Sequence, residues 1–394
     1  MIFNSLGSNY DFNFVLRSLF SCGSKKDHRV LETFLSERYG GRTVLLYKAR
    51  EAIKLALNSL NLPGGSRVGI NGFTCYVVYQ AIKEAGLTPE FLDIDKKTLN
   101  FSVEELEKSK SLKVVIIQNT LGNPCDIERI SDYCQGNGII LIEDLAHSVG
   151  TRYKNGKEAG TIGDFVTLSF SQDKIVDAVS GGALIVRNPK YFNFDIKPLK
   201  SLSLAARLKD RFYPVFTFKI RELYPYGLGK LLHFLLKKLN LLSKPLEIGE
   251  GITFQSMPNW YAKLVNRSFK EFERVLKHRM ETALIYASNL DQKILSKDYV
   301  SNINLSSCIR FPIFVKERKD LINYLKEYGI FVSDIWYDAP VAPLRLLSKT
   351  DYEGECPFSE KVSKEIVNLP THVNISSKDA VNISELINKW LNTK

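Results

Sequence analysis

Three side chains near the middle of the chain have types and spacing that suit covalent chemistry on a carbonyl compound. Asp144 ends the apolar run 138–144, His147 follows it by three residues, and Lys174 lies in a ten-residue connection between two further apolar runs. A lysine amine can attack a carbonyl group, and a carboxylate or an imidazole can hold or move a proton beside it. Each residue also has an ordinary explanation, since loop lysines are usually solvated, acids end many strands and many histidines are structural. The residues around them in the sequence are needed to distinguish a catalytic role from these ordinary explanations.

Pyridoxal 5'-phosphate (PLP) is a cofactor that needs this combination of groups. It needs a lysine for its aldehyde, a carboxylate beside its ring nitrogen so that the ring acts as an electron sink, and hydrogen-bond donors for its phosphate. A helix N-terminus with a hydroxyl or an arginine beside it is well suited to the phosphate. Lys174 and Asp144 supply the first two groups in a plausible order, and Ser169 is a candidate for the third. The residues are thus compatible with PLP as a cofactor.

The elements that must position these residues form a regular alternation between Leu45 and Arg187. Four short apolar runs are predicted as strands, at about 68–71, 90–94, 113–119 and 138–144, and the segments 76–86, 102–109 and 126–138 have helical spacing between them. Strands that are apolar on both faces and alternate with helices indicate a parallel sheet covered on both sides. Asp144 then lies at the carboxyl end of a strand, where such sheets bind ligands. The runs 164–170 and 181–187, which flank Lys174, are too close together for a crossover helix.

The segment around Lys174, EAGTIGDFVTLSFSQDKIVDAVSGGALIVRNP, closely resembles the lysine region of the DegT/DnrJ/StrS-type nucleotide-sugar aminotransferases. In that family a G-x-x-G-D element leads into a strand ending Ser-Phe, the PLP lysine follows five residues after the serine, and a Gly-Gly pair follows seven residues after the lysine. IEDLAHSVG resembles the family's E-D-x-A-(Q/H) element, and SEKVSKEIVNLPTH resembles its S-x-x-L-P-x-H closing segment. The resemblance covers roughly residues 40–190 and 255–390. The intervals are kept at Gly160, Gly163, Asp164, Ser169, Phe170, Lys174, Gly181 and Gly182.

This resemblance implies a PLP-dependent transferase of fold type I, in the aspartate aminotransferase superfamily. The expected fold class is α/β, with a large domain built on a mostly parallel seven-stranded sheet and a smaller α+β C-terminal domain. The expected division is an N-terminal arm (1–25), the large PLP-binding domain (26–190), a basic amphipathic insertion (191–255) and the small domain (256–394). Within the small domain, 259–290 is predicted as one long helix, and the chain is predicted to end in a capped helix. Enzymes of this type are usually homodimers with active sites at the subunit interface, so a homodimer is expected.

The resemblance also assigns roles to individual residues. It implies that Lys174 carries PLP as a Schiff base, that Asp144 pairs with the ring nitrogen and that His147 contacts the ring. The family's Gly-Thr pair at the phosphate-binding helix is replaced here by Ala49-Arg50, where backbone N–H groups and the guanidinium could still bind phosphate. The aromatic residue that stacks on the ring aligns with Cys75, and two aromatic residues stand beside it. The full set of predicted cofactor-binding residues is Lys174, Asp144, His147, Ser169, Ala49, Arg50, Phe73, Cys75 and Tyr76.

The activity implied is the transfer of an amino group from an amino acid, by resemblance glutamate, to a nucleotide-linked 4-keto-6-deoxysugar in amino-sugar or polysaccharide biosynthesis. A PLP-dependent sugar dehydratase is an alternative, although family members of that kind have a histidine in place of the lysine. A non-catalytic membrane-surface or regulatory protein on the same fold is a second alternative. The sequence does not distinguish the sugar, the nucleotide or the pathway.

The net charge of +11 is concentrated in one segment. Between Lys197 and Lys244 there are eleven Lys or Arg residues against two acids. No nucleic-acid-binding module accompanies this charge, so no nucleic-acid partner is expected. The segment contains GLGKLLHFLLKKLNLLSKP, which is amphipathic enough to lie on a membrane surface, although a solvated helical lid or packing arm is the favoured interpretation. A peripheral contact through 197–244, at the inner face of the membrane, is therefore one expectation.

The remaining composition favours a cytoplasmic enzyme without a metal. The six cysteines are scattered and contain no CxxC pair, and only five histidines are present. This pattern argues for reduced thiols and against both a disulfide framework and a zinc site. No apolar run reaches the roughly 18 residues that span a bilayer, and the N-terminus does not have the pattern of a signal peptide.

Overall fold

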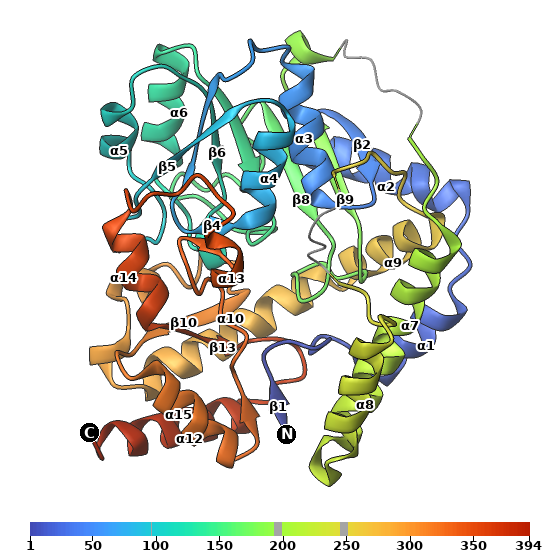
Figure 1. The fold of residues 1–394 in the computed structure, drawn as a ribbon, viewed down its shortest axis with the longest axis vertical. Helices are drawn as coiled ribbons and strands as arrows, with labels where there is room; N and C mark the ends of the chain where they lie inside the picture. Colours follow the sequence, from blue (N-terminus) through green and yellow to red (C-terminus); the bar gives the residue numbers. More distant parts are fainter. Residues whose placement is uncertain (96, 193–198, 245–250) are drawn as a thin grey trace.

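The computed structural model describes residues 1–95, 97–192, 199–244 and 251–394. Its centre is a seven-stranded sheet with the strand order β2-β9-β8-β7-β6-β3-β5 (Figure 1). Strand β9 runs opposite to the other six strands of this sheet, which all point in one direction. The predicted α/β class with a mostly parallel seven-stranded sheet is therefore confirmed. The strands are β2 Arg42–Leu46, β3 Arg67–Asn71, β5 Thr88–Leu92, β6 Leu112–Ile117, β7 Ile140–Asp144, β8 Phe165–Ser169 and β9 Gly182–Val186.

Helices cover both faces of this sheet because successive side chains of each strand point to opposite sides. In β6, Val114 and Ile116 join the hydrophobic cluster under α3 and α4, whereas Val115 and Ile117 join the larger cluster under α2, α5, α6 and α9. The continuous apolar strands of the sequence are thus explained by burial on two sides. The covering helices are α2 Lys25–Tyr39, α3 Ala49–Ser59, α4 Tyr76–Glu84, α5 Val103–Lys108, α6 Ile127–Gly136 and α9 Asn259–Lys270.

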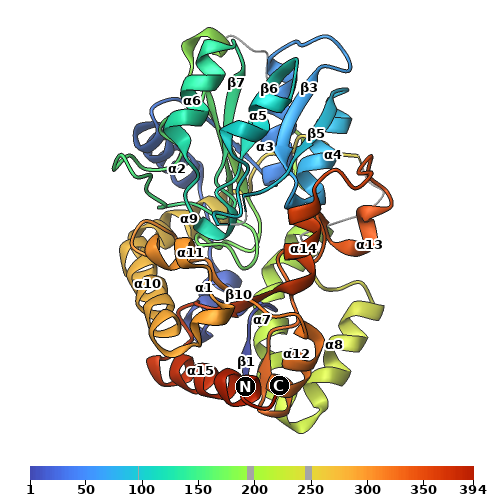
Figure 2. The same cartoon turned by 90° about the vertical axis from the view of Figure 1, so that its left-hand side faces the viewer.

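The C-terminal part forms a second α+β layer below the sheet (Figure 2). Its central strands β10 and β13 are antiparallel, and the short N-terminal strand β1 pairs in parallel with β11, so the first residues of the chain belong to this layer. The last helix has the predicted cap, a Ser376–Asp379 capping box. The elements are β1 Ile2–Phe3, α10 Phe272–Asn289, α11 Lys297–Ser301, β10 Arg310–Phe314, α12 Arg318–Glu327, β11 Ile330–Phe331, α13 Leu344–Leu347, α14 Pro357–Glu365, β13 Ile366–Pro370 and α15 Ser377–Leu391.

The prediction of one long helix over 259–290 is wrong. Helix α9 ends at Lys270 and α10 begins at Phe272, with Glu271 between them at φ −98° and ψ 1°. Helix α9 packs on α2 beside the central sheet, whereas α10 packs on α15 of the C-terminal layer. The two halves of the segment therefore have different packing partners, which the helical periodicity of the sequence does not reveal. The predicted strands and the other predicted helices lie within two residues of their observed positions at most ends.

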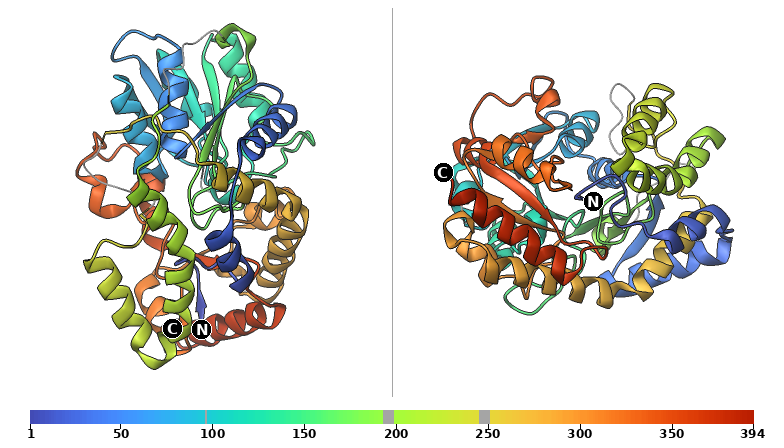
Figure 3. Two further views of the ribbon diagram at one scale, coloured as in Figure 1. Left: turned by 90° about the vertical axis from the view of Figure 1, so that its right-hand side faces the viewer. Right: turned by 90° about the horizontal axis from the view of Figure 1, so that it is seen from below.

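The basic segment forms two helices, α7 Leu204–Leu223 and α8 Leu228–Lys238, which pack on each other, and α7 also packs on α1 Phe12–Phe20 (Figure 3). Residues 197 and 198 of the predicted membrane-contact segment lie outside the described residues. Tyr213, Ile220 and Leu236 share a hydrophobic cluster with Tyr10 and with Val179 of the Lys174 loop. The segment therefore packs against the catalytic body as well as contributing charge. Among the described helices, none combines the length and the apolarity needed to cross a bilayer.

Candidate active site

Asp144 is fixed at the carboxyl end of β7, at the edge of the sheet that faces the second layer. It is 4% exposed, and its Oδ1 accepts hydrogen bonds from the Ala146 amide at 3.0 Å and from Thr167 Oγ1 at 3.2 Å. Burial raises the pKa of Asp144, while the Ala146 amide, Lys174 and Thr167 lower it. Within the described part of the chain its second oxygen, Oδ2, accepts no hydrogen bond. That oxygen is available to a ligand.

The neighbouring acid, Glu143, has a structural role. Its carboxylate accepts hydrogen bonds from the Tyr153 hydroxyl and from the amides of Gly160, Ile162 and Gly163, at 2.6 to 2.8 Å. A Cβ at Gly163 would lie 2.9 Å from the Leu141 carbonyl oxygen, so this close approach requires glycine. The G-x-x-G-D element thus folds around the Glu143 carboxylate. These hydrogen bonds fix the position at which β8 begins relative to Asp144 at the end of β7.

Lys174 lies in the loop between β8 and β9, and the N-terminal segment holds that loop in place. Asn9 Nδ2 donates to the Lys174 carbonyl oxygen and to Asp177 Oδ2, both at 3.1 Å, and Ser8 Oγ donates to Asp173 Oδ1 at 3.3 Å. The Tyr10 hydroxyl donates to Asp177 Oδ1 at 2.8 Å. Each of these contacts joins two residues that are more than 160 positions apart in the chain. They fix the backbone of the lysine before any ligand binds.

The Lys174 side chain is half-buried in the protein. Burial, and more weakly the charge of Arg310, lowers the pKa of Lys174 to about 8, although Cys75 and Asp144 oppose this shift. Its Nζ lies 4.3 Å from the ring centroid of Trp336. A lysine with this pKa has much more free amine at neutral pH than a solvated lysine, which favours covalent attachment to a carbonyl compound.

We expect the rate at which Lys174 attaches PLP to follow its lowered pKa. Because only the unprotonated amine reacts, the rate constant should rise about tenfold per pH unit below pH 8 and level off above it. The measurement is the attachment rate in full-length apo-protein, trapped with borohydride at pH 6 to 10. Nα-acetyl-lysine, whose amine is solvated, is the reference and should keep rising beyond pH 9. A protein profile that also rises up to pH 10 would contradict the lowered pKa.

His147 lies in an aromatic stack beside Asp144. The Leu121 amide donates to Nδ1 at 3.3 Å, so the neutral ring carries its proton on Nε2, which lies 3.2 Å from the Tyr337 hydroxyl. The ring is parallel to Trp336, with centroids 4.9 Å apart, and to Tyr337, with centroids 5.5 Å apart. Burial, with the charges of Lys174 and Arg310, holds the pKa of His147 well below its ordinary value. His147 is therefore a neutral ring that contacts other rings.

The predicted phosphate-binding residues meet at the start of α3. Ala49 and Arg50 form the first turn of this helix, and Lys48 precedes it as the N-cap. Ser169 at the end of β8 pairs with Gly182, where a Cβ would lie 2.6 Å from the Ala49 nitrogen. The Gly-Gly pair therefore lets the end of β8 at Ser169 approach the N-terminus of α3 closely. A hydroxyl close to a helix N-terminus is an arrangement that suits a phosphate.

The three candidates for the ring-stacking position differ in their surroundings. Phe73 is fully buried and packs edge-on against Tyr337, with centroids 5.3 Å apart. Tyr76 is the first residue of α4, and its ring contacts Tyr79. The Cys75 thiol has its pKa raised by burial and is sensitive to the charges of Lys174, Arg50 and Asp144.

These residues fit PLP by the chemistry of their free groups. Asp144 Oδ2 can accept from a ring N–H, and the amine of Lys174 is poised for a carbonyl. Ser169 is 5% exposed, and its hydroxyl makes no hydrogen bond within the described part of the chain. The fit therefore rests on three free polar groups and on the glycine-lined start of α3.

Several residues of this site carried no signal in the sequence. Arg310, Trp336 and Tyr337 come from the C-terminal layer and reach the Lys174 loop only through the fold. Lys48 is 8% exposed, and its Nζ donates to Ser180 Oγ at 3.1 Å. Its position before a helix start could have identified it, because a cation there would complement a bound anion. A separate cavity of about 380 Å³, lined by Arg207, Arg211 and the Ser256–Trp260 turn, does not include any of the predicted site residues.

Comparison with known sequences confirms the family resemblance seen in the motifs, and it extends over most of the chain. The sequence profile of the DegT/DnrJ/EryC1/StrS aminotransferase family matches residues 30–388. A GDP-perosamine synthase of Escherichia coli O157:H7 is 26% identical over 349 residues, covering 87% of this chain and 84% of that protein. A GDP-4-keto-6-deoxy-D-mannose 3-dehydratase of Yersinia pseudotuberculosis is 25% identical over 334 residues, covering 82% and 79%.

Comparison with solved structures supports the fold. Helicobacter pylori PseC, an aminotransferase involved in the biosynthesis of pseudoaminic acid, superposes with a TM-score of 0.71 at 18% identity, covering 96% of this chain and 95% of that chain. At this identity the likeness shows the architecture alone.

Proposed function

Because the chain belongs to the DegT/DnrJ/EryC1/StrS aminotransferase family, we propose that it is a PLP-dependent transaminase that moves an amino group from an amino acid to a nucleotide-linked keto sugar. The observation that carries the proposal is the joint placement of Lys174 and Asp144 at one end of the sheet, next to the start of α3. The synthase and dehydratase relatives are both named after GDP-linked sugars, which supports a nucleotide-sugar substrate. The donor is proposed to be glutamate and the acceptor a 4-keto-6-deoxysugar.

The roles of this chain's residues follow from their geometry. When bound, PLP supplies an electron sink for a carbanion. Lys174 Nζ is the base that takes the proton from the donor's α-carbon, and because its pKa is lowered to about 8, a large fraction of its amine is unprotonated near pH 8. Asp144 Oδ2 holds a proton on the ring nitrogen. Ser169 and the Ala49–Arg50 backbone bind the phosphate, and the neutral rings of His147 and Trp336 exclude water from the reacting atoms.

The dehydratase alternative and the non-catalytic alternative are less well supported. A family member specialised for dehydration has a histidine where this chain has Lys174, and a protein that had lost catalysis would not need a half-buried lysine with a lowered pKa near a buried acid. The test is an absorbance spectrum of full-length protein after incubation with PLP and desalting. We expect a visible band that bleaches on addition of glutamate. A band that glutamate leaves unchanged would count against glutamate as donor, and no band would remove the enzyme proposal.

A homodimer is part of the proposal, supported by the usual assembly of fold type I enzymes. Sedimentation of the active enzyme at assay concentration should give twice the chain mass. A monomer that still turns over would contradict it.

Contact with an anionic membrane surface through α8 is also proposed. The exposed side chains Leu228, Leu231 and Leu235 form one stripe at helical spacing, with Phe234 beside it. From 223 to 244 the chain has four lysines and no acid. Apolar side chains between lysines suit the boundary between anionic head groups and acyl chains.

We expect the double variant Leu231→Ser/Phe234→Ser to bind vesicles of phosphatidylglycerol and phosphatidylcholine at least about tenfold more weakly than the wild type, because two apolar side chains are lost from the contact. The measurement is co-sedimentation with vesicles, and Leu344→Ser, an exposed leucine on α13, is the matched control. Wild-type sedimentation that does not depend on the anionic lipid would refute the contact. If the variant instead turns a dimer into a monomer, the stripe is a subunit interface.

A further inference from the structure

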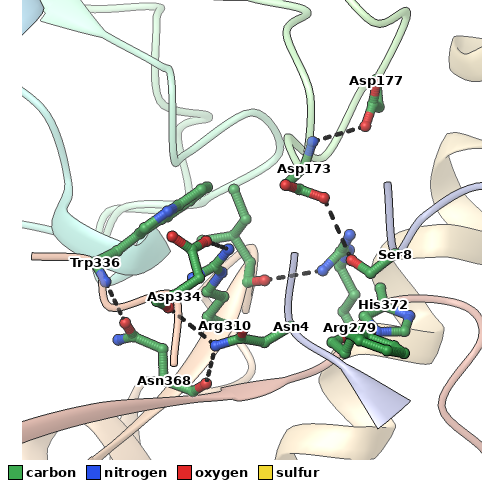
Figure 4. Close-up of polar contacts among 12 residues, drawn as sticks. Asn4, Ser8, Asp173, Asp177, Arg279, Arg310, Asp334, Trp336, Asn368 and His372 are labelled. Atoms are coloured by element: carbon green, nitrogen blue, oxygen red, sulfur yellow. Dashed lines mark hydrogen bonds and ion pairs between the residues drawn. The ribbon is translucent and has the colours of Figure 1, made fainter. Parts of the chain in front are cut away.

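A buried arginine of the C-terminal layer is paired with an acid that faces solvent. Arg310 begins β10, and its side chain is 3% exposed, whereas the side chain of Asp334 is 41% exposed. Arg310 Nη2 donates to Asp334 Oδ2 at 2.7 Å, and Nη1 donates to the Asp334 carbonyl oxygen at 2.8 Å (Figure 4). The Asp334 carboxylate therefore lies on the solvent side of a guanidinium that is otherwise enclosed.

One indole ring connects this arginine with Lys174. The Arg310 Cζ lies 3.8 Å from the ring centroid of Trp336, and the Lys174 Nζ lies 4.3 Å from the same centroid. In an α-amino acid the carboxylate is attached to the carbon that carries the amino group. A donor whose amino group reaches Lys174 therefore brings its carboxylate into the neighbourhood of Arg310, whose planar fork suits bidentate binding of a carboxylate.

The backbone that carries Asp334 is held independently of its side chain. Asn4 Nδ2 donates to the Asp334 carbonyl oxygen at 3.0 Å and to the Asn368 carbonyl oxygen at 3.1 Å, and the Trp336 amide donates to Asn368 Oδ1 at 2.5 Å (Figure 4). Rotation of the Asp334 side chain would leave these contacts, and the Arg310 Nη1 contact, in place. The movement is favourable only if another anion takes over Nη2, because an unpaired buried charge is costly.

The other buried arginine in Figure 4 is occupied differently. Arg279 donates to the Ile309 carbonyl oxygen, to Thr371 Oγ1 and to Asn9 Oδ1, and it has no carboxylate partner among the described residues. Its contacts hold the N-terminal segment and β10 together. Arg310 is the arginine of this pair whose partner a ligand can replace.

We infer that Arg310 binds the α-carboxylate of the amino donor, and that Asp334 is an internal carboxylate which occupies this position until the donor displaces it. The inference rests on the proposed transaminase function, because it assigns the donor to the space beside Lys174. It adds that the donor must carry a free α-carboxylate and that Asp334 competes with it. Asp334 thereby weakens donor binding while it keeps the buried guanidinium paired in the free enzyme.

The test compares two ligands that differ only in the carboxylate. 2-Methylalanine has no α-hydrogen and so cannot complete the transfer, and 2-methylalaninamide is the same compound without the negative charge. Dissociation constants for both are measured from the change in the visible band of full-length, PLP-loaded protein. In Arg310→Gln we expect 2-methylalanine to bind about 10- to 100-fold more weakly, the range for losing hydrogen bonds to a charged group. The amide should change by less than about twofold, since it makes no charged contact with Arg310.

Further variants separate a binding role from a structural one. Asp334→Asn should tighten the binding of 2-methylalanine severalfold and leave the amide unchanged, because the internal competitor has lost its charge. Arg310→Lys should restore part of the affinity, since it keeps the charge but loses the fork. Arg345→Gln, an exposed arginine on α13, is the matched control and should alter neither constant. An Arg310→Gln variant that weakens both ligands equally, or neither, overturns the inference, as does an Asp334→Asn variant without effect.

A second measurement keeps this result separate from the proposed function. The chain has three tryptophans, and Trp336 lies against Arg310, so glutarate binding can be followed by tryptophan fluorescence in protein without PLP. We expect a saturable change that is absent in Arg310→Gln and in Trp336→Phe. If the wild type has no visible band with PLP but shows this change, the enzyme proposal fails and the carboxylate site stands. If glutarate causes no change, the site is refuted.

Discussion

Lys174→Ala is expected to lose covalent PLP and to reduce amino transfer by at least about 10⁴-fold, the upper range for removing a general acid–base group. The physical reason is that one side chain holds the cofactor and moves the proton of the donor's α-carbon. The loop that carries it is held by Ser8, Asn9 and Tyr10 through contacts to the backbone and to Asp173 and Asp177. Removing the Lys174 side chain therefore leaves the loop intact. The measurement is the visible band after desalting, together with the rate of the glutamate half-reaction.

The control for this variant is Lys157→Ala, an exposed lysine upstream of β8, which should keep both the band and the rate. A small primary amine such as methylamine should restore part of the Lys174→Ala rate, because it can replace the missing base. A Lys174→Ala protein that keeps the band through desalting would show that another lysine carries the cofactor.

Asp144→Asn is expected to slow amino transfer by about 10²- to 10³-fold, the loss typical of one preorganised electrostatic contact. Asparagine keeps the shape of aspartate and an oxygen that can accept from Ala146 and Thr167, so β7 should be undisturbed. What it loses is the negative charge that holds a proton on the ring nitrogen. The visible band should persist, since Lys174 is unchanged, but the glutamate half-reaction should be slow.

The matched control is Asp132→Asn, an exposed acid on α6, whose rate should equal that of the wild type. The thermal melting temperature of each apo-protein separates a loss of charge from a loss of folding. An Asp144→Asn enzyme with the wild-type rate would mean that another group, or none, holds the ring proton.

The predicted long helix over 259–290, which is two helices in the structure, shows that sequence periodicity alone does not locate helix ends. Residues 259–290 have continuous helical spacing, yet the helix breaks at Glu271, with α9 packed on α2 and α10 packed on α15. Periodicity reports only that one face of a segment is buried. It carries no information about whether the burying partner changes along the segment.

The sequence by itself determined the parallel sheet and the order of Asp144, Ser169 and Lys174 along it. These features depend on local rules, namely strand patterns that reflect burial on two faces, and on intervals within about 40 residues that resemble the family's motif. Because parallel strands end at one edge of the sheet, neighbouring strand ends in the sequence become neighbours in space. The proposal that the start of α3 binds the phosphate came from the family resemblance of the sequence around Ala49 and Arg50.

Only the tertiary structure decided which residues complete the site. Arg310 and Trp336 reach Lys174 from another layer, and Ser8 and Asn9 hold its loop from the opposite end of the chain. Such contacts join residues that are more than 130 positions apart and lie on elements with no common local pattern. They arise from the packing of β1 and β10 beneath the sheet, and packing depends on the shape of both partners at once.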